Sequence, residues 1–306
     1  MSQQPREAVR LLSGNEAIAR GAHEAGVTVA SAYPGTPSTE ILEYLAEYDG
    51  VHAQWAPNEK VAVEVALGAS MAGARALAAM KHVGVNVDAD PIFTASYTGV
   101  RGGLVIITAD DPEMHSSQNE QDNRHYAQAA KIPMLEPADS AETKAYTKLA
   151  FALSERFDTP VFLRTTTRVA HATGPVPLED PQPSGMTPGF VEDPAKWVML
   201  PVNARKRHVV VEERMRALRE FAETFEGNRI EWRDRTLGII TAGVAYQYVR
   251  EACPDVSVLK LGMAHPLPER LIREFAAGVT RLVVVEELDP IIETHVKAMG
   301  IPVTGK

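Results

Sequence analysis

The pattern of apolar and polar positions switches repeatedly between two periods along the first half of the chain. Short runs of branched apolar residues indicate buried strands, and segments with apolar residues every three or four positions indicate amphipathic helices. Strands are expected at "VTVASAY" (27–33), "GGLVIITAD" (102–110) and "TPVFLRTTT" (159–167), and helices at "NEAIARGAHEAG" (15–26), "STEILEYLAEY" (38–48), "NEKVAVEVALGASMAGARALAAM" (58–80) and "SAETKAYTKLAFALSERF" (140–157). Helices and strands in alternation predict an α/β fold with a largely parallel sheet covered by helices on both faces.

The alternation stops near residue 172 and resumes near residue 236. Residues 173–201 are dense in Pro and Gly, which predicts a connecting arm without elements, and residues 205–233 predict one long charged helix with a solvated face. The remainder repeats the strand and helix pattern on a smaller scale. We therefore predict a large domain at 1–172, an arm and helix at 173–235, and a smaller α/β domain at 236–306.

The stretch "VASAYPGTPSTEI" (29–41) predicts a strand that turns sharply into a helix. Pro34 and Gly35 mark the turn, Thr36 is the expected N-cap, and Pro37 is expected at the first helical position. Free N–H groups and the positive end of a helix dipole favour an anion or a hydrogen-bond acceptor at such a corner. A purely structural corner stays open as the alternative.

A second informative stretch is "WAPNEKVAVEVALGASMAG" (55–73), a small-residue helix interrupted by two carboxylates. Asn58 is the expected N-cap, and Glu59 lies in the first turn. Glu64 is rotated from Glu59 by about 140°, so the two do not share a face. The helix dipole alone can explain a first-turn Glu, and a lone histidine such as His82 or His115 can be a structural residue.

Composition removes several classes of function. The net charge of −9 disfavours a nucleic-acid partner, and a single cysteine, Cys253, excludes an internal disulfide, a Cys-rich zinc site and a chain-ligated iron–sulfur cluster. The dinucleotide and P-loop glycine fingerprints do not occur. With no apolar run of membrane-spanning length and a polar start at residues 1–10, the sequence predicts a cytoplasmic protein without a membrane span.

Three motifs in order, "YPGTPSTE", "WAPNEKVAVEVALGASMAGARALAAMKHVGVN" and "ADDPEMHSSQNEQDNR", carry a resemblance that extends from residue 11 to the C-terminus. The chain resembles the 2-oxoacid:ferredoxin oxidoreductases, and most of all the amino-terminal half of the α subunit in their indolepyruvate-type members. The resemblance implies a thiamine-diphosphate pyrimidine-binding domain at 11–172 and a transketolase-C-terminal-like domain at 236–303.

The resemblance also implies roles for individual residues. Glu59 matches the family glutamate that hydrogen-bonds the aminopyrimidine ring and is the expected catalytic residue, and Thr36 matches the threonine that binds the substrate's carboxylate or carbonyl group. The remaining expectations are a cofactor-binding role for Pro34, Gly35 and His82, and a substrate-binding role for Lys81, Gln118 and Gln121. Asp110 and Asp111 stand where some pyruvate-specific relatives have an arginine, which favours an aryl 2-oxoacid such as indolepyruvate.

An absent motif completes the sequence-based expectations. Family enzymes hold the diphosphate through Mg²⁺ with Gly-Asp-Gly, and this chain has none. We expect Mg²⁺, the diphosphate half of the site and a [4Fe-4S] cluster on another subunit or a missing C-terminal segment, and no metal on this chain. The predicted reaction is oxidative decarboxylation of the 2-oxoacid with CoA to acyl-CoA, with ferredoxin as electron acceptor, in a homo- or hetero-oligomer. The alternative is a non-catalytic assembly or binding module that keeps the fold.

Overall fold

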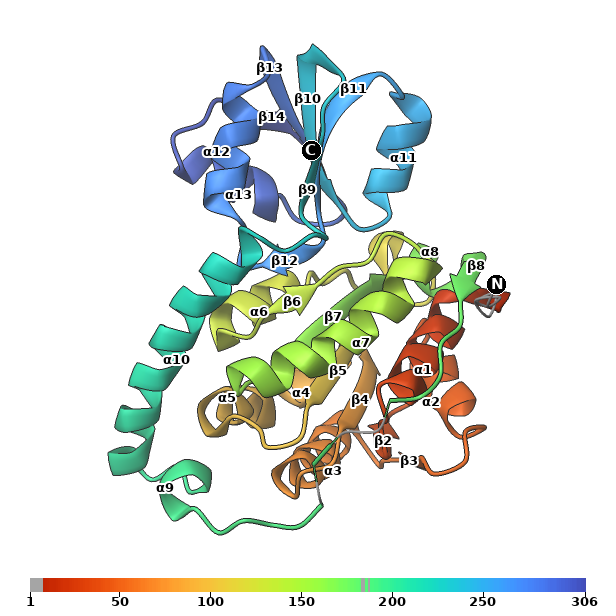
Figure 1. The fold of residues 1–306 in the computed structure, drawn as a ribbon, viewed down its shortest axis with the longest axis vertical. Coiled ribbons are helices and arrows are strands. Elements are labelled where there is room, and N and C mark those ends of the chain that lie inside the picture. The colour runs from red at the N-terminus through yellow and green to blue at the C-terminus, as the bar shows by residue number, and fades with distance from the viewer. Residues whose placement is uncertain (1–7, 183–184, 187) are drawn as a thin grey trace, which may run out of the picture.

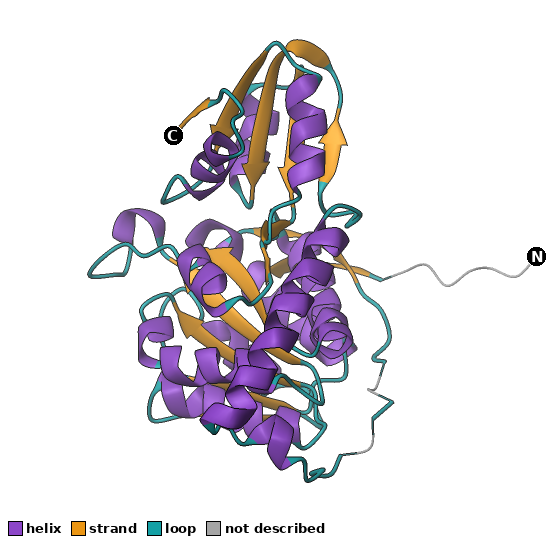
Figure 2. Cartoon of the chain, turned by 90° about the vertical axis from the view of Figure 1, so that its left-hand side faces the viewer, coloured by secondary structure: helices purple, strands orange, loops and turns teal. Residues whose placement is uncertain are grey.

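The computed structural model describes residues 8–182, 185–186 and 188–306. Figure 1 shows a large layered α/β body with a smaller sheet and its helices stacked at one end, and Figure 2 shows the same stacking from the side. Residues 1–7 of the predicted first domain, and residues 183, 184 and 187 of the predicted arm, lie outside the described residues. In the described parts of the chain, no helix combines the length and the apolar character needed to cross a membrane.

The larger sheet confirms the predicted parallel arrangement. Its order is β12-β6-β7-β5-β4-β2-β3 in the described residues, and every neighbouring pair is parallel except β12 with β6. The strands are β2 (Val29–Ala32), β3 (His52–Trp55), β4 (Ala76–Lys81), β5 (Leu104–Asp110), β6 (Met134–Leu135), β7 (Val161–Thr166) and β12 (Met263–His265). Parallel strands place their carboxyl ends at one edge, so the segments after β2, β4 and β5 meet there.

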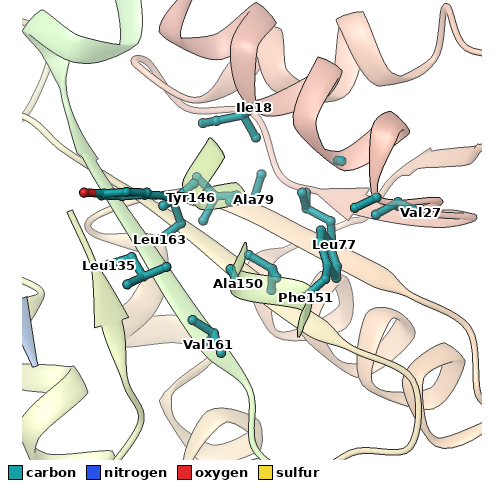
Figure 3. Close-up of a cluster of buried hydrophobic side chains, with 14 of the residues drawn as sticks. Ile18, Val27, Leu77, Ala79, Leu135, Tyr146, Ala150, Phe151, Val161 and Leu163 are labelled. Atoms are coloured by element: carbon teal, nitrogen blue, oxygen red, sulfur yellow. The ribbon is translucent and has the colours of Figure 1, made fainter. Parts of the chain in front are cut away.

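Helices cover both faces of this sheet, as the pattern predicts. Successive strand residues point to opposite faces. Leu77 and Ala79 therefore pack with α1 (Gly14–Glu24), α2 (Thr39–Leu45) and α7 (Ser140–Phe157), in the cluster drawn in Figure 3. On the other face, Ala78 and Met80 pack in a cluster formed with α3 (Glu59–Met71), α4 (Gly84–Val87), α5 (Ala89–Thr98) and α6 (Arg124–Ala130).

The smaller sheet lies in the C-terminal part of the chain. Its order is β14-β13-β10-β11-β9, with β9 antiparallel and the other pairs parallel. The elements are β9 (Arg229–Glu231), β10 (Asp234–Ala242), β11 (Val256–Leu261), β13 (Arg281–Val285), β14 (Thr304–Gly305), α11 (Ala245–Ala252), α12 (Glu269–Ala277) and α13 (Ile291–Ala298). The second α/β alternation is thereby confirmed, although β12 leaves this group to pair with β6 of the larger sheet.

The segment between the two sheets differs from the prediction. The Pro/Gly-rich stretch contains β8 (Thr173–Pro177), which pairs with β1 (Val9–Ser13), and α9 (Pro194–Trp197). The charged helix is α10 (Pro201–Ala222), shorter than the predicted 205–233 at its C-terminal end. Asn228 explains where it stops, because its amide donates to Ala222 O at 2.8 Å and its carbonyl accepts from Gly262 N at 2.8 Å. The division of the chain at residues 172 and 236 stays a prediction.

Another predicted element is shorter than expected. The helix expected over 58–80 ends at Met71, and residues 76–81 form strand β4. Gly73 has a φ of +89°, a conformation that glycine adopts easily, and it reverses the chain between the two elements. The small elements α8 (Thr167–His171) and the 3₁₀ turn Pro112–Met114 complete the fold.

A buried charge network joins the two parts of the molecule. Arg164 on β7 donates from Nε to Asp110 Oδ2 at 2.7 Å and from Nη1 to Glu136 Oε1 at 2.6 Å. Arg124 at the start of α6 contacts Asp122 through two nitrogens and Glu286 Oε2 at 2.6 Å. Because Glu286 directly follows β13 of the smaller sheet, these contacts fix the C-terminal part against the larger sheet.

Candidate active site

The turn after β2 has a different cap from the predicted one. Helix α2 begins at Thr39, and its N-cap is Ser38, whose side chain makes no capping hydrogen bond. Thr36 is exposed, and the Thr36–Pro37 peptide bond is cis. The predictions of Thr36 as N-cap and Pro37 as first helical residue are therefore wrong.

Two N–H groups of this turn donate to atoms within the turn itself. Gly35 N donates to Thr39 Oγ1 at 3.0 Å, and Ser38 N donates to Gly35 O at 2.8 Å. Ser38 Oγ closes the turn further by donating to the same carbonyl at 2.8 Å. Side chains of the turn therefore hold its shape. Helix α2 has only seven residues, and we assign no anion site to its N-terminus. What the turn presents outward is Pro34 and the exposed Thr36 hydroxyl.

Glu59 is the first residue of α3, as the sequence predicts. The Asn58 side chain caps the helix by accepting from Val61 N at 3.0 Å. Glu59 is only 9% exposed, while Glu64 on the same helix is exposed, so the two carboxylates lie on different faces as expected. Within the described residues, no hydrogen bond or ion pair joins the Glu59 carboxylate to another side chain or to the backbone. A carboxylate that is nearly buried yet unpaired can still accept a ligand's N–H.

Gly84 sets the position of Glu59. A Cβ atom at Gly84 would lie 2.6 Å from Glu59 Cγ, 2.9 Å from Glu59 Oε1 and 3.0 Å from Met80 Cβ. Only glycine leaves room for the glutamate side chain against the start of α4. The helix start on one side and the glycine on the other therefore restrict where the Glu59 carboxylate can lie.

Lys81 and His82 follow the end of β4 and link the turn to the loop after β5. Lys81 Nζ donates to Ser116 O at 2.5 Å, and its Cβ lies 3.0 Å from where a Cβ of Gly35 would be. His82 is completely buried, with Nε2 at 3.2 Å from Asn119 O, and burial lowers its pKa, which keeps the ring neutral near pH 7. His82 thus holds the loop from inside the protein.

The loop of residues 111–123 carries the two predicted glutamines. Asp111 organises its first part by accepting from Ser116 N at 2.8 Å, Ser117 Oγ at 2.5 Å and Thr167 Oγ1 at 2.7 Å. Burial acts to raise the pKa of Asp111, but these hydrogen bonds outweigh it and lower the pKa. Gln121 donates to Asn119 Oδ1 at 3.0 Å.

These contacts bring most of the predicted site residues to one edge of the sheet. Gly35, Lys81 and the loop are in contact, His82 anchors the same loop, and Gly84 joins the strand end to Glu59. Gln118 is exposed in the loop, and no contact among the described residues places it or His115 beside Glu59. Asp110 belongs to the buried network, where burial, opposed by Arg164, raises its pKa to about 6.

An acidic residue to which the sequence pattern assigns no role lies near the site. Asp88 is fully buried between α4 and α5, and burial together with the charge of Glu59 raises its pKa to about 8. The sequence offers only a weak signal, because Asp88 is one of two acids, with Asp90, in the mixed run "GVNVDADPIF". That signal does not say which way the side chain points, because the run crosses two short helices.

A cavity of about 380 Å³ lies between the loop and the C-terminal part and is lined by His115, Arg168, Tyr248 and Lys306 among others, but neither Glu59 nor Thr36 lines it. The elements around Glu59 carry exposed apolar side chains instead. These are Tyr33, Trp55, Val87 and Phe93.

Comparisons with known proteins agree with this architecture. Residues 20–215 match the family model described as pyruvate flavodoxin/ferredoxin oxidoreductase, thiamine diphosphate-binding. The chain is 48% identical over 302 residues to indolepyruvate oxidoreductase subunit IorA of Archaeoglobus fulgidus, covering 95% of this chain and 48% of that protein. The IorA subunit of Thermococcus kodakarensis is 45% identical over 317 residues, covering 97% of this chain and 49% of that protein. The chain thus spans about half the length of these curated relatives.

A solved structure shares the fold. The 2-oxoglutarate:ferredoxin oxidoreductase from Magnetococcus marinus, determined with 2-oxoglutarate, coenzyme A and succinyl-CoA bound, superposes with a TM-score of 0.84 at 19% identity. The match covers 99% of this chain and 62% of that chain. A family model that covers most of the chain and relatives near 48% identity lead to one conclusion. The chain belongs to the 2-oxoacid:ferredoxin oxidoreductase family and contains its thiamine diphosphate-binding domain.

Proposed function

We propose that this chain supplies the pyrimidine-binding half of a thiamine-diphosphate active site that oxidatively decarboxylates an aryl 2-oxoacid such as indolepyruvate, with CoA as acyl acceptor and ferredoxin as electron acceptor. The observation that carries the proposal is the Glu59 carboxylate, which is nearly buried at a helix start, is placed by Gly84 and has no partner among the residues that the structure describes. A carboxylate in this state fits an aminopyrimidine ring, which offers a ring nitrogen that shares a proton.

Thiamine diphosphate, when bound, supplies the chemistry that stabilises the carbanion formed on loss of CO₂. Glu59 holds the proton at the ring nitrogen, which is the general acid–base contribution of this chain. Thr36 offers its hydroxyl to the substrate's carboxylate or carbonyl oxygen, and Lys81 adds a positive charge beside the same turn. Pro34 and Gly35 form the wall of the turn, and neutral His82 keeps the loop in place.

We place loop 111–123 on the substrate side of the proposed active site. Gln118 and Gln121 are the side chains of this loop that we assign to substrate contacts, with Gln121 oriented by its hydrogen bond to Asn119. The anionic carboxylate of Asp111 is already satisfied by three hydrogen bonds, so it does not oppose a substrate carboxylate strongly. The roles assigned to Gln118 and Gln121 concern substrate binding and not proton transfer.

A partner segment must provide the rest of the site. The chain has no Gly-Asp-Gly sequence for Mg²⁺ and the diphosphate, and it matches only about half the length of its IorA relatives. The exposed apolar side chains of Tyr33, Trp55, Val87 and Phe93 around Glu59 support docking of that partner. We assign Mg²⁺, the diphosphate and a [4Fe-4S] cluster to the partner.

Reconstitution tests the proposal. The chain is co-expressed with a polypeptide carrying Gly-Asp-Gly and ferredoxin-type cysteines, and reduction of a viologen dye is followed with indolepyruvate, CoA and thiamine diphosphate. We expect dye reduction that requires both polypeptides and is faster with indolepyruvate than with 2-oxoglutarate. A stable complex that binds thiamine diphosphate but reduces no dye with any 2-oxoacid would favour the non-catalytic module.

Gly84→Ala provides a second test of how Glu59 is placed. The added methyl group would overlap Glu59 Cγ at 2.6 Å, so the carboxylate must move. Displacing a catalytic group by about 1 Å can cost about 100-fold in rate, and we expect a fall of at least about tenfold in kcat. The measurement is dye reduction by the reconstituted complex.

The matched control is Gly68→Ala on α3. A Cβ atom at Gly68 meets nothing within 4 Å, and alanine favours the helix by about 1 kcal/mol over glycine. We expect wild-type activity and equal or higher thermal stability for this variant. Equal activity of Gly84→Ala and Gly68→Ala would contradict the proposed placement of Glu59.

A further inference from the structure

Asp88 is a fully buried acid that no structural role explains. It precedes α5 at the N-cap position, but its side chain makes no capping hydrogen bond. Its exposure is 0%, and neither Oδ1 nor Oδ2 has a hydrogen-bond partner in the described residues. The neighbouring Val85 and Ile92 are also fully buried, so the carboxyl group lies in an apolar layer. An ionised carboxylate in this position would be strongly disfavoured.

The same short segment joins Asp88 to Glu59. Asp88 N donates to Gly84 O at 3.2 Å, and Gly84 is the residue on which the Glu59 side chain rests. Helix α3, which begins with Glu59, packs against both α4 and α5. Burial first and the charge of Glu59 second raise the pKa of Asp88 to about 8.

Ionisable groups on the other elements packed around Asp88 have partners of their own. Lys60 on α3 pairs with Asp90 at 3.1 Å, Glu64 is exposed, and Lys81 on β4 donates to Ser116 O. The remaining groups are His82 with Asn119 O, Tyr126 on α6 with Asn86 Oδ1, and, at the far end of α5, His208 with Tyr97 and Arg214 with Ser96 O. Glu59 is the charge that acts on Asp88.

We propose that Asp88 is a positioning residue for Glu59, with a buried and unpaired carboxyl group that keeps its proton at neutral pH and so adds no charge beside the Glu59 side chain. Two neighbouring carboxyl groups resist ionising together, and the proton stays on the member that solvent cannot reach. The effect of Asp88 on catalysis rests on the proposed function. The pairing of the Asp88 and Glu59 carboxyl groups does not depend on it.

The proposal predicts an alkaline limit. Above about pH 8, Asp88 loses its proton, and a second charge develops beside Glu59 in an apolar layer. This charge destabilises the start of α4, including Gly84, against which Glu59 is held. The proton therefore has to be retained for the Glu59 carboxylate to keep its place.

The first experiment uses the chain without cofactor. Infrared difference spectra between the wild type and Asp88→Asn should show a protonated carboxyl band at pH 7 that disappears above about pH 8. In Glu59→Gln the same band should disappear at a lower pH, because the neighbouring charge is gone. If Asp88→Asn does not fold, Asp88→Ala serves as the reference. No band at pH 7, or a band whose titration ignores Glu59→Gln, overturns the proposal.

The second experiment uses the reconstituted complex. Wild-type kcat/KM should fall by about tenfold per pH unit above about pH 8, and the Asp88→Asn profile should lack this limb. An unchanged limb in Asp88→Asn overturns the positioning role. If the complex is inactive in every form while the infrared titration behaves as expected, the proposed function fails and the carboxyl pair stands.

Discussion

Replacing Glu59 with glutamine should reduce 2-oxoacid-dependent dye reduction by the reconstituted complex at least about 100-fold, the usual scale of a lost general acid–base group. Glutamine keeps the shape of the side chain, so the contact with Gly84 and the Asn58 cap should survive. The amide cannot hold or share the proton at the pyrimidine nitrogen. The loss should therefore appear in kcat with little change in thermal stability.

Glu64→Gln is the matched control for this prediction. Glu64 lies on the same helix but is exposed, and its ion pair with Lys60 is long at 4.0 Å. An exposed pair of this kind contributes little to stability, and the side chain does not face the site. We expect wild-type turnover from Glu64→Gln. Full turnover from Glu59→Gln in a complex that binds thiamine diphosphate would falsify the assignment of the catalytic residue.

Replacing Arg124 with methionine should lower the free energy of unfolding by about 3–5 kcal/mol, because it leaves buried charges without their partner. The Arg124 side chain is 1% exposed, and the side chains of Asp122 and Glu286 are 0% and 1% exposed. Arg124 Nη2 also donates to the carbonyl oxygens of Glu287 at 2.7 Å and Asp289 at 2.9 Å. Methionine fills similar space but satisfies none of these groups.

Urea unfolding at pH 7 measures this effect, and Arg270→Met is the control. Arg270 pairs with Glu220 at 2.9 Å, but both side chains are more than half exposed, so its loss should cost less than about 1 kcal/mol. If Arg124→Met and Arg270→Met unfold at the same urea concentration, the buried network does not hold the two parts of the molecule together.

The pH dependence of stability gives an independent check on the network. Burial acts to raise the pKa of Asp122, but the guanidinium groups of Arg164 and Arg124 outweigh it and lower the pKa to about 2 from an ordinary 3.8. The unfolded chain therefore binds a proton at a higher pH than the folded chain. The contribution of Asp122 to stability is fully present above about pH 4 and is lost as the pH falls through about 2. In Arg124→Met this acid-sensitive contribution should be smaller.

Several errors of the sequence-based prediction have one cause. Thr36 and Pro37 look like a helix start, yet the turn is held by contacts among Gly35, Ser38 and Thr39 that propensity alone does not rank. The charged helix stops at Ala222 because Asn228 binds its last carbonyl and the β11–β12 connection at once. Both boundaries depend on specific hydrogen bonds, which periodicity does not report.

The sequence by itself determined the alternating α/β fold, its covered parallel sheet, the family, and a capped helix with Glu59 in its first turn and Glu64 on another face. These are local properties, because hydrophobic period, capping residues and motif order are written in neighbouring positions. Only the tertiary structure decided that β12 joins the larger sheet, that Gly84 fixes Glu59, that Asp88 is buried beside it, and that Arg124 and Arg164 join the two parts. Strand order, burial and charge pairing depend on residues far apart in the chain, which meet only when it folds.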